Sequence, residues 1–127
     1  MNIWIFISGL IALLTSFIHI FAGQIEPVRP FLKSRLDGIS KATLLACWHI
    51  TSVTLLTSSC LLTYVGWVDE VKLYDVVFFL GVLYCLYGIV FIVIGIYFFS
   101  ASTLIKLPQW SLLLPIGLLA IWGGTQV

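Results

Sequence analysis

The two histidines of this sequence, His19 and His49, are the residues whose chemistry is least expected from their surroundings, because each lies inside a long apolar run. An ionisable side chain in such a run is costly and usually points toward a partner in the protein interior. An imidazole there can exchange hydrogen bonds, pass a proton near neutral pH, or ligate a metal ion or haem iron. Their role therefore depends on which elements bring them together.

Other polar and aromatic side chains are expected at the same end of the molecule as the two imidazoles. Glu26 and Arg29 follow the apolar run that holds His19, and Trp48 precedes His49 directly. The candidate binding set is completed by two residues that open the last apolar run, Gln109 and Trp110.

Three interpretations of this set remain open. In the first, the imidazoles bond Ser, Thr or backbone groups of neighbouring helices and only fix the helix register. In the second, the set forms a cytoplasmic-side polar pocket for a small ligand or an ion. In the third, His19 and His49 ligate haem b or a transition metal in an electron-transfer subunit, with Glu26 as a third ligand for Zn or Cu.

The elements that position these residues follow from the composition. The chain of 127 residues is 61% hydrophobic and only 9% charged, whereas a soluble domain has about 25% charged residues. Its apolar residues fall into four runs, at about 3–22, 42–65, 75–99 and 109–124. The sequence therefore predicts an all-α integral membrane protein, with residues 1–127 forming one antiparallel four-helix transmembrane bundle.

The fourth run is the exception among these helices. At about 1.5 Å per residue, the first three runs are long enough to cross a hydrocarbon core of about 30 Å. The fourth run is shorter and contains Pro115, so we expect a kink there or a locally thinned bilayer.

The basic residues predict the orientation in the membrane. The connections 23–41 and 100–108 share one side of a four-span protein, and only Lys72 lies in the connection on the other side. Five of the six basic residues lie in these two connections, namely Arg29, Lys33, Arg35, Lys41 and Lys106. The positive-inside rule puts both connections in the cytoplasm of a plasma or inner membrane, with both termini outside. No basic residue precedes Arg29, so we interpret the first run as a retained helix and not as a signal peptide.

The first connection is expected to contact anionic lipids through its basic side chains. Pro27 and Pro30 should end the first helix and stiffen an extended segment. Phe31, Leu32 and Leu36 interleave with the charges, which allows a short interfacial helix as an alternative.

Small residues predict where helices approach each other closely. The first helix has a small and polar stripe on one face, and the second has polar residues on two faces. The third has a line of small residues, Gly81, Cys85, Gly88 and Gly95, a pattern typical of tight helix packing in membranes. Such lines are interpreted first as packing surfaces within the bundle; they also allow a homodimer or, as an alternative function, a non-catalytic accessory or scaffold subunit of a larger membrane complex.

Several function classes find no support. No nucleophile–base arrangement, zinc-protease motif or phosphate-binding glycine loop is visible, so we do not expect an enzyme. A net charge of +1 provides no electrostatic footprint for nucleic acid. The three cysteines, Cys47, Cys60 and Cys85, lie in apolar runs and are interpreted as packing residues.

Overall fold

The computed structural model describes residues 1–126, apart from the side chains at positions 101 and 103. Within this part of the chain all regular structure is helical. Three helical stretches are long and apolar enough to cross a membrane, and a fourth apolar helix is shorter. The long stretches are Ile3–Lys33, Gly38–Val68 and Val71–Phe99, and the shorter helix is Trp110–Gly124.

The first long stretch consists of three segments. Helix α1 (Ile3–Gly23) continues through a π-helical turn, η1 (Gln24–Val28), into the short helix α2 (Arg29–Lys33). The backbone leaves helical geometry only at Glu26, next to the cis peptide bond that precedes Pro27. The expected extended segment is therefore wrong for Arg29–Lys33, because Pro30 lies in the first turn of a helix, where its missing N–H costs nothing.

The remaining helices follow in order. They are α3 (Gly38–Val68), η2 (Val71–Leu73), α4 (Tyr74–Phe99), η3 (Ser100–Ser102), α5 (Thr103–Lys106) and α6 (Trp110–Gly124). Helix α3 begins four residues before the predicted position 42 because Asp37 caps it: the Asp37 carboxylate accepts hydrogen bonds from the backbone N–H and the hydroxyl of Ser40, at 2.8 and 2.7 Å. These two bonds hold the pKa of Asp37 below its usual value. Helix α6 runs through Pro115 without interruption.

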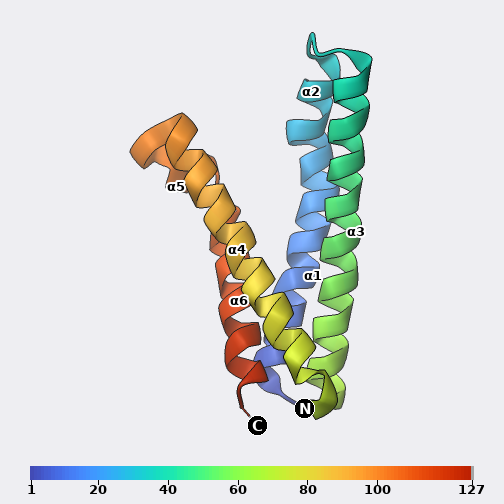
Figure 1. Cartoon of the computed structure of the whole chain (residues 1–127), viewed down its shortest axis with the longest axis vertical. Coiled ribbons are helices and arrows are strands. Elements are labelled where there is room, and N and C mark those ends of the chain that lie inside the picture. Colours follow the sequence, from blue (N-terminus) through green and yellow to red (C-terminus); the bar gives the residue numbers. More distant parts are fainter. Residues whose placement is uncertain (127) are drawn as a thin grey trace.

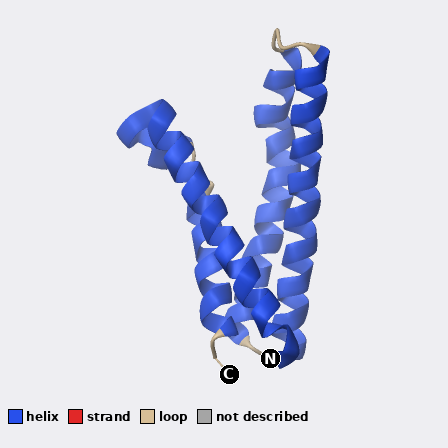
Figure 2. Cartoon of the chain, in the orientation of Figure 1, coloured by secondary structure: helices blue, strands red, loops and turns tan. Residues whose placement is uncertain are grey.

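The helices form two pairs that converge at one end (Figures 1 and 2). Helix α1 packs along α3, α4 packs along α6, and the contact between the two pairs is mainly that of α1 with α6. The termini and the α3–α4 connection lie at the convergent end, and the two pairs diverge toward α2 and α5. The compact bundle that we expected is thus closed at one end only.

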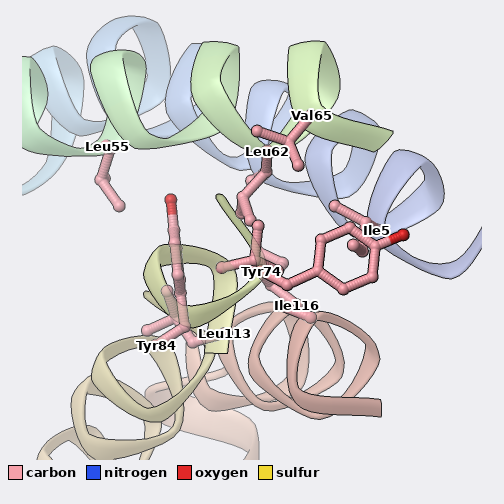
Figure 3. Close-up of a cluster of buried hydrophobic side chains, with 11 residues drawn as sticks. Ile5, Leu55, Leu62, Val65, Tyr74, Tyr84, Leu113 and Ile116 are labelled. Carbon is pink, nitrogen blue, oxygen red and sulfur yellow. The ribbon is translucent and has the colours of Figure 1, made fainter. Parts of the chain in front are cut away.

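The buried core lies where the pairs meet (Figure 3). Leu62 and Val65 of α3 pack with Ile5 of α1, Tyr74 of α4 and Ile116 of α6. Two buried hydroxyl contacts join the pairs farther from this end. Ser8 donates to the carbonyl of Ile116 at 2.8 Å, and the hydroxyls of Ser58 and Tyr84 lie 2.8 Å apart.

Asn2 connects the four apolar helices, α1, α3, α4 and α6, at the convergent end. Its side-chain amide donates to the Tyr74 hydroxyl of α4 at 2.9 Å and to the Gly123 carbonyl of α6 at 3.0 Å. Its side-chain oxygen caps α1, and its backbone N–H donates to the Gly66 carbonyl of α3 at 2.9 Å. Asn2 therefore makes hydrogen bonds to all four apolar helices where they converge.

Glycines allow the closest approaches within each pair. A Cβ at Gly66 of α3 would collide with the backbone of Phe6 in α1. On α4, a Cβ at Gly81 would lie 2.9 Å from the Gly117 carbonyl of α6, and one at Gly88 would lie 2.9 Å from the Leu114 side chain. Gly81, Cys85 and Gly88 of this line are therefore covered by α6 of the same chain, so this part of the line is not an open face for another subunit.

Candidate functional site

The His19 imidazole packs against the indole of Trp48, where the C-terminal part of α1 meets α3. The two rings are stacked, with centroids 4.0 Å apart and an interplanar angle of 14°. Gly23, one turn after His19, provides the space for the indole, because a Cβ at this position would collide with the six-membered part of the Trp48 ring. The Nε2 atom of His19 is buried and has no hydrogen-bond partner among the residues that the structure describes.

His49 lies on a different face of α3. Ser58 faces α4, since its hydroxyl contacts that of Tyr84. At about 100° per residue, positions 49 and 58 lie about 180° apart around the helix. The imidazole of His49 is also exposed. The expectation that both imidazoles face the interior of the bundle is therefore wrong for His49, which faces away from α4.

His49 instead lines a shallow pocket of about 250 Å³ on the outer surface of the α1/α3 pair. Trp48 belongs to the wall of this pocket, whereas His19 does not. Three polar side chains and three aliphatic ones complete the lining, namely Gln24, His49 and Ser52 with Ile20, Val53 and Leu56. Because His49 precedes Val53 and Leu56 along α3, the polar groups lie mainly toward α2 and the aliphatic groups toward the convergent end.

The other predicted site residues do not join this pocket. Glu26 and Arg29 are exposed at the turn between α1 and α2, and no ion pair joins them. Gln109 and Trp110 lie at the start of α6, where the Trp110 indole N–H donates to the Leu104 carbonyl at 3.4 Å. They belong to the α4/α6 pair, which diverges from α1 and α3 at this end (Figure 1). The prediction that all seven candidate binding residues lie together is therefore wrong for Gln109 and Trp110.

The metal-binding interpretation finds no assembled site in the described chain. Among residues 1–126, no group of three or more His, Cys, Asp or Glu side chains could hold a metal ion, so Glu26 is not a third ligand beside the histidines. A haem between His19 and His49 would require both rings to face one space, whereas His19 is stacked on Trp48 and His49 points outward.

Two pocket residues were missed by the sequence analysis as site residues. Ser52 follows His49 by three residues, the spacing of neighbours on one helix face, and its hydroxyl donates to the Trp48 carbonyl at 3.0 Å. Gln24 directly follows α1 and lines the same pocket. The helical spacing could have identified Ser52, whereas the position of Gln24 depends on how α1 and α3 are aligned.

No protein-family model, curated protein or solved structure matches this chain. The pocket on α1 and α3 is therefore interpreted from its own geometry.

Proposed function

We propose that this chain is an integral membrane protein with four crossings, and that it binds a small amphiphile in the pocket on α1 and α3. The three long apolar helices support a membrane location. The clustering of basic residues in 23–41 and 100–108 supports a cytoplasmic position for the divergent end. Helix α6 is about 22 Å long, so the bilayer should thin beside the α4/α6 pair.

Tryptophans support a specific depth for the pocket. Trp4 and Trp67 are exposed near the convergent end, at 44% and 66%, where exposed indoles are typical of a membrane interface. Along α3, Trp48 lies about 28 Å from Trp67, which is close to the thickness of a hydrocarbon core of about 30 Å. Trp48 and the pocket would then lie at the opposite boundary between the hydrocarbon core and the head groups.

The observation that carries the proposal is a mainly apolar pocket at this depth, with His49 and Gln24 at the end that lies toward the head groups. His49 and Gln24 are exposed, and they offer hydrogen bonds to a polar head. Val53 and Leu56 offer an apolar surface for a chain that extends toward the middle of the bilayer. The part of the pocket wall that Trp48 forms is held in place by its stacking on His19, so it is already formed without a ligand.

Native mass spectrometry of the full chain in a mild detergent tests this function, with lysophosphatidylcholine as the probe. We expect a saturable adduct that is weakened at least threefold by His49→Ala, because the exposed ring contributes to the pocket and not to the core. Tyr64→Ala is the matched control, since Tyr64 is an exposed aromatic residue of the same helix near the convergent end. Equal adducts in all three proteins, or no adduct in any, would refute the proposal.

The orientation has a separate test. Tags that report their compartment, fused in turn to each terminus, should both report the non-cytoplasmic side. A tag inserted after Asp37, in the connection between α2 and α3, should report the cytoplasm. Opposite compartments for the two termini would contradict four crossings.

A further inference from the structure

We propose that the amphiphile bound by this pocket is an anionic phospholipid, and that Lys41 binds its phosphate. This inference rests on the proposed function, and it adds the charge of the ligand and the residue that selects it. Three observations support it: the register of Lys41 on α3, the absence of protein partners for the cations at this end, and the apolar side chains between those cations.

Lys41 lies on the same face of α3 as the pocket wall. It precedes Trp48 by about two helical turns, so the two side chains lie about 20° apart around the helix and about 10 Å apart along its axis. Lys41 is half-buried, which is consistent with a lysine whose aliphatic stem lies along the helix surface while its ammonium group reaches outward. A lipid whose glycerol contacts Gln24 and His49 would have its phosphate on the side of Lys41.

The cations at this end of the α1/α3 pair have no acidic partner in the part of the chain that the structure describes. Arg29, Lys33 and Arg35 are exposed, and within residues 1–126 none of them, nor Lys41, forms an ion pair. The nearby carboxylate of Asp37 is occupied as the cap of α3, where it accepts two hydrogen bonds from Ser40. Four cations at this end, Arg29, Lys33, Arg35 and Lys41, outnumber the two carboxylates Glu26 and Asp37, so the end of the α1/α3 pair has a net positive charge beyond the pocket.

The surroundings of these cations fit a lipid better than a free anion in water. Leu32, Leu36 and Ile39 are exposed between them, and 81% of the Ile39 surface is accessible. Apolar side chains interleaved with basic ones are typical of segments that lie in an anionic membrane surface. A dissolved phosphate would use the cations but would leave both these side chains and the aliphatic part of the pocket without a partner.

The test compares phosphatidylglycerol with phosphatidylcholine, at equal concentrations, as adducts of the detergent-purified full chain in native mass spectrometry. We expect phosphatidylglycerol to bind more tightly, and Lys41→Gln to weaken it about fivefold, the equivalent of about 1 kcal/mol. Binding of phosphatidylcholine should change little, because it depends on the pocket and much less on the cation.

Two charge-matched controls separate a site from a general surface charge. Lys106→Gln removes a cation at the same end of the other pair, where Lys106 lies 5.0 Å from the centre of the Phe99 ring. Lys72→Gln removes the cation of the α3–α4 connection. Both variants should retain the preference for phosphatidylglycerol. If Lys106→Gln weakens binding as much as Lys41→Gln does, a specific role of Lys41 is refuted.

The remaining outcomes are also distinguishable. Equal binding of the two lipids, sensitive to His49→Ala but not to Lys41→Gln, would overturn the anionic selectivity and leave the amphiphile pocket standing. Failure of both lipids and of lysophosphatidylcholine to bind would remove the pocket function itself. Complete competition by millimolar inorganic phosphate would show that the site takes the phosphate group without the lipid, and would also overturn this inference.

Discussion

Replacing Asn2 should destabilise the fold far more than its position near the end of the chain suggests. The Asn2 amide makes two hydrogen bonds to other helices, with the Tyr74 hydroxyl and the Gly123 carbonyl. Each such bond contributes about 1 kcal/mol net. Its side-chain oxygen also accepts a hydrogen bond from the Ile5 N–H at 3.3 Å, and loss of an N-cap costs about 1 kcal/mol. We therefore expect Asn2→Ala to cost about 3 kcal/mol.

A second variant separates the cap from the connections between helices. Asn2→Ser keeps a good N-cap residue but is too short to reach both α4 and α6, so it should cost about 2 kcal/mol. The free energy of unfolding can be measured by equilibrium titration with sodium dodecyl sulfate in mixed micelles, followed by tryptophan fluorescence. A loss below about 0.5 kcal/mol for Asn2→Ala would refute the idea that this residue holds the helices together.

Three further predictions concern contacts within and between the helix pairs. Ser58→Ala and Tyr84→Phe should each cost about 1 kcal/mol, and the double variant should cost less than the sum, because both remove one hydroxyl contact; additive losses in the same titration would contradict this. Gly66→Ala should cost about 1–3 kcal/mol by overpacking against α1, whereas Gly38→Ala, which meets nothing within 4 Å, should be close to neutral; equal effects would contradict the close approach. Hydrogen bonds from the Tyr74 hydroxyl, and secondly from the N-terminal ammonium group, hold the pKa of Asp69 below its usual value. The ionised Asp69 thus stabilises the folded state above the unfolded pKa of 3.8, and this stability is lost as the pH falls through the lower folded pKa. Thermal unfolding between pH 6 and pH 3 should therefore show a larger acid loss in the wild type than in Asp69→Asn, and identical profiles would exclude this role.

The extents of the helices could be predicted closely wherever apolar composition alone determines them. The predicted range 3–22 compares with Ile3–Gly23 in the structure, and 75–99 compares with Tyr74–Phe99. The start of α3 was placed too late because a side-chain cap determines it, and the cap residue Asp37 lies outside the apolar run. The helical course of Arg29–Lys33 was predicted only as an alternative to an extended segment, since Pro27 and Pro30 indicate a helix end.

The candidate site was predicted in part, because counting crossings tells which end of a helix a residue occupies but not which face. His19 and Trp48 were assigned to the same end and are in contact. Gln109 and Trp110 were assigned to that end as well, but they lie on the other helix pair. The lateral distance between the pairs depends on side-chain packing near the convergent end, which periodicity does not encode.

The polar face of α3 provides a physical reason why the two pairs can diverge. At Ser58 this face contacts α4, and Leu62 and Val65 beyond it are buried in the common core. Thr54 and Thr51, one and two turns farther from the convergent end, are not buried. Their hydroxyls donate to carbonyls of their own helix, those of Ile50 and Cys47, each at 2.9 Å. Hydroxyls that are satisfied in this way need no partner from another helix, even in a bilayer. Polar residues in the middle of α3 therefore do not require a closed bundle, and the two helix pairs can diverge without leaving these hydroxyls unsatisfied.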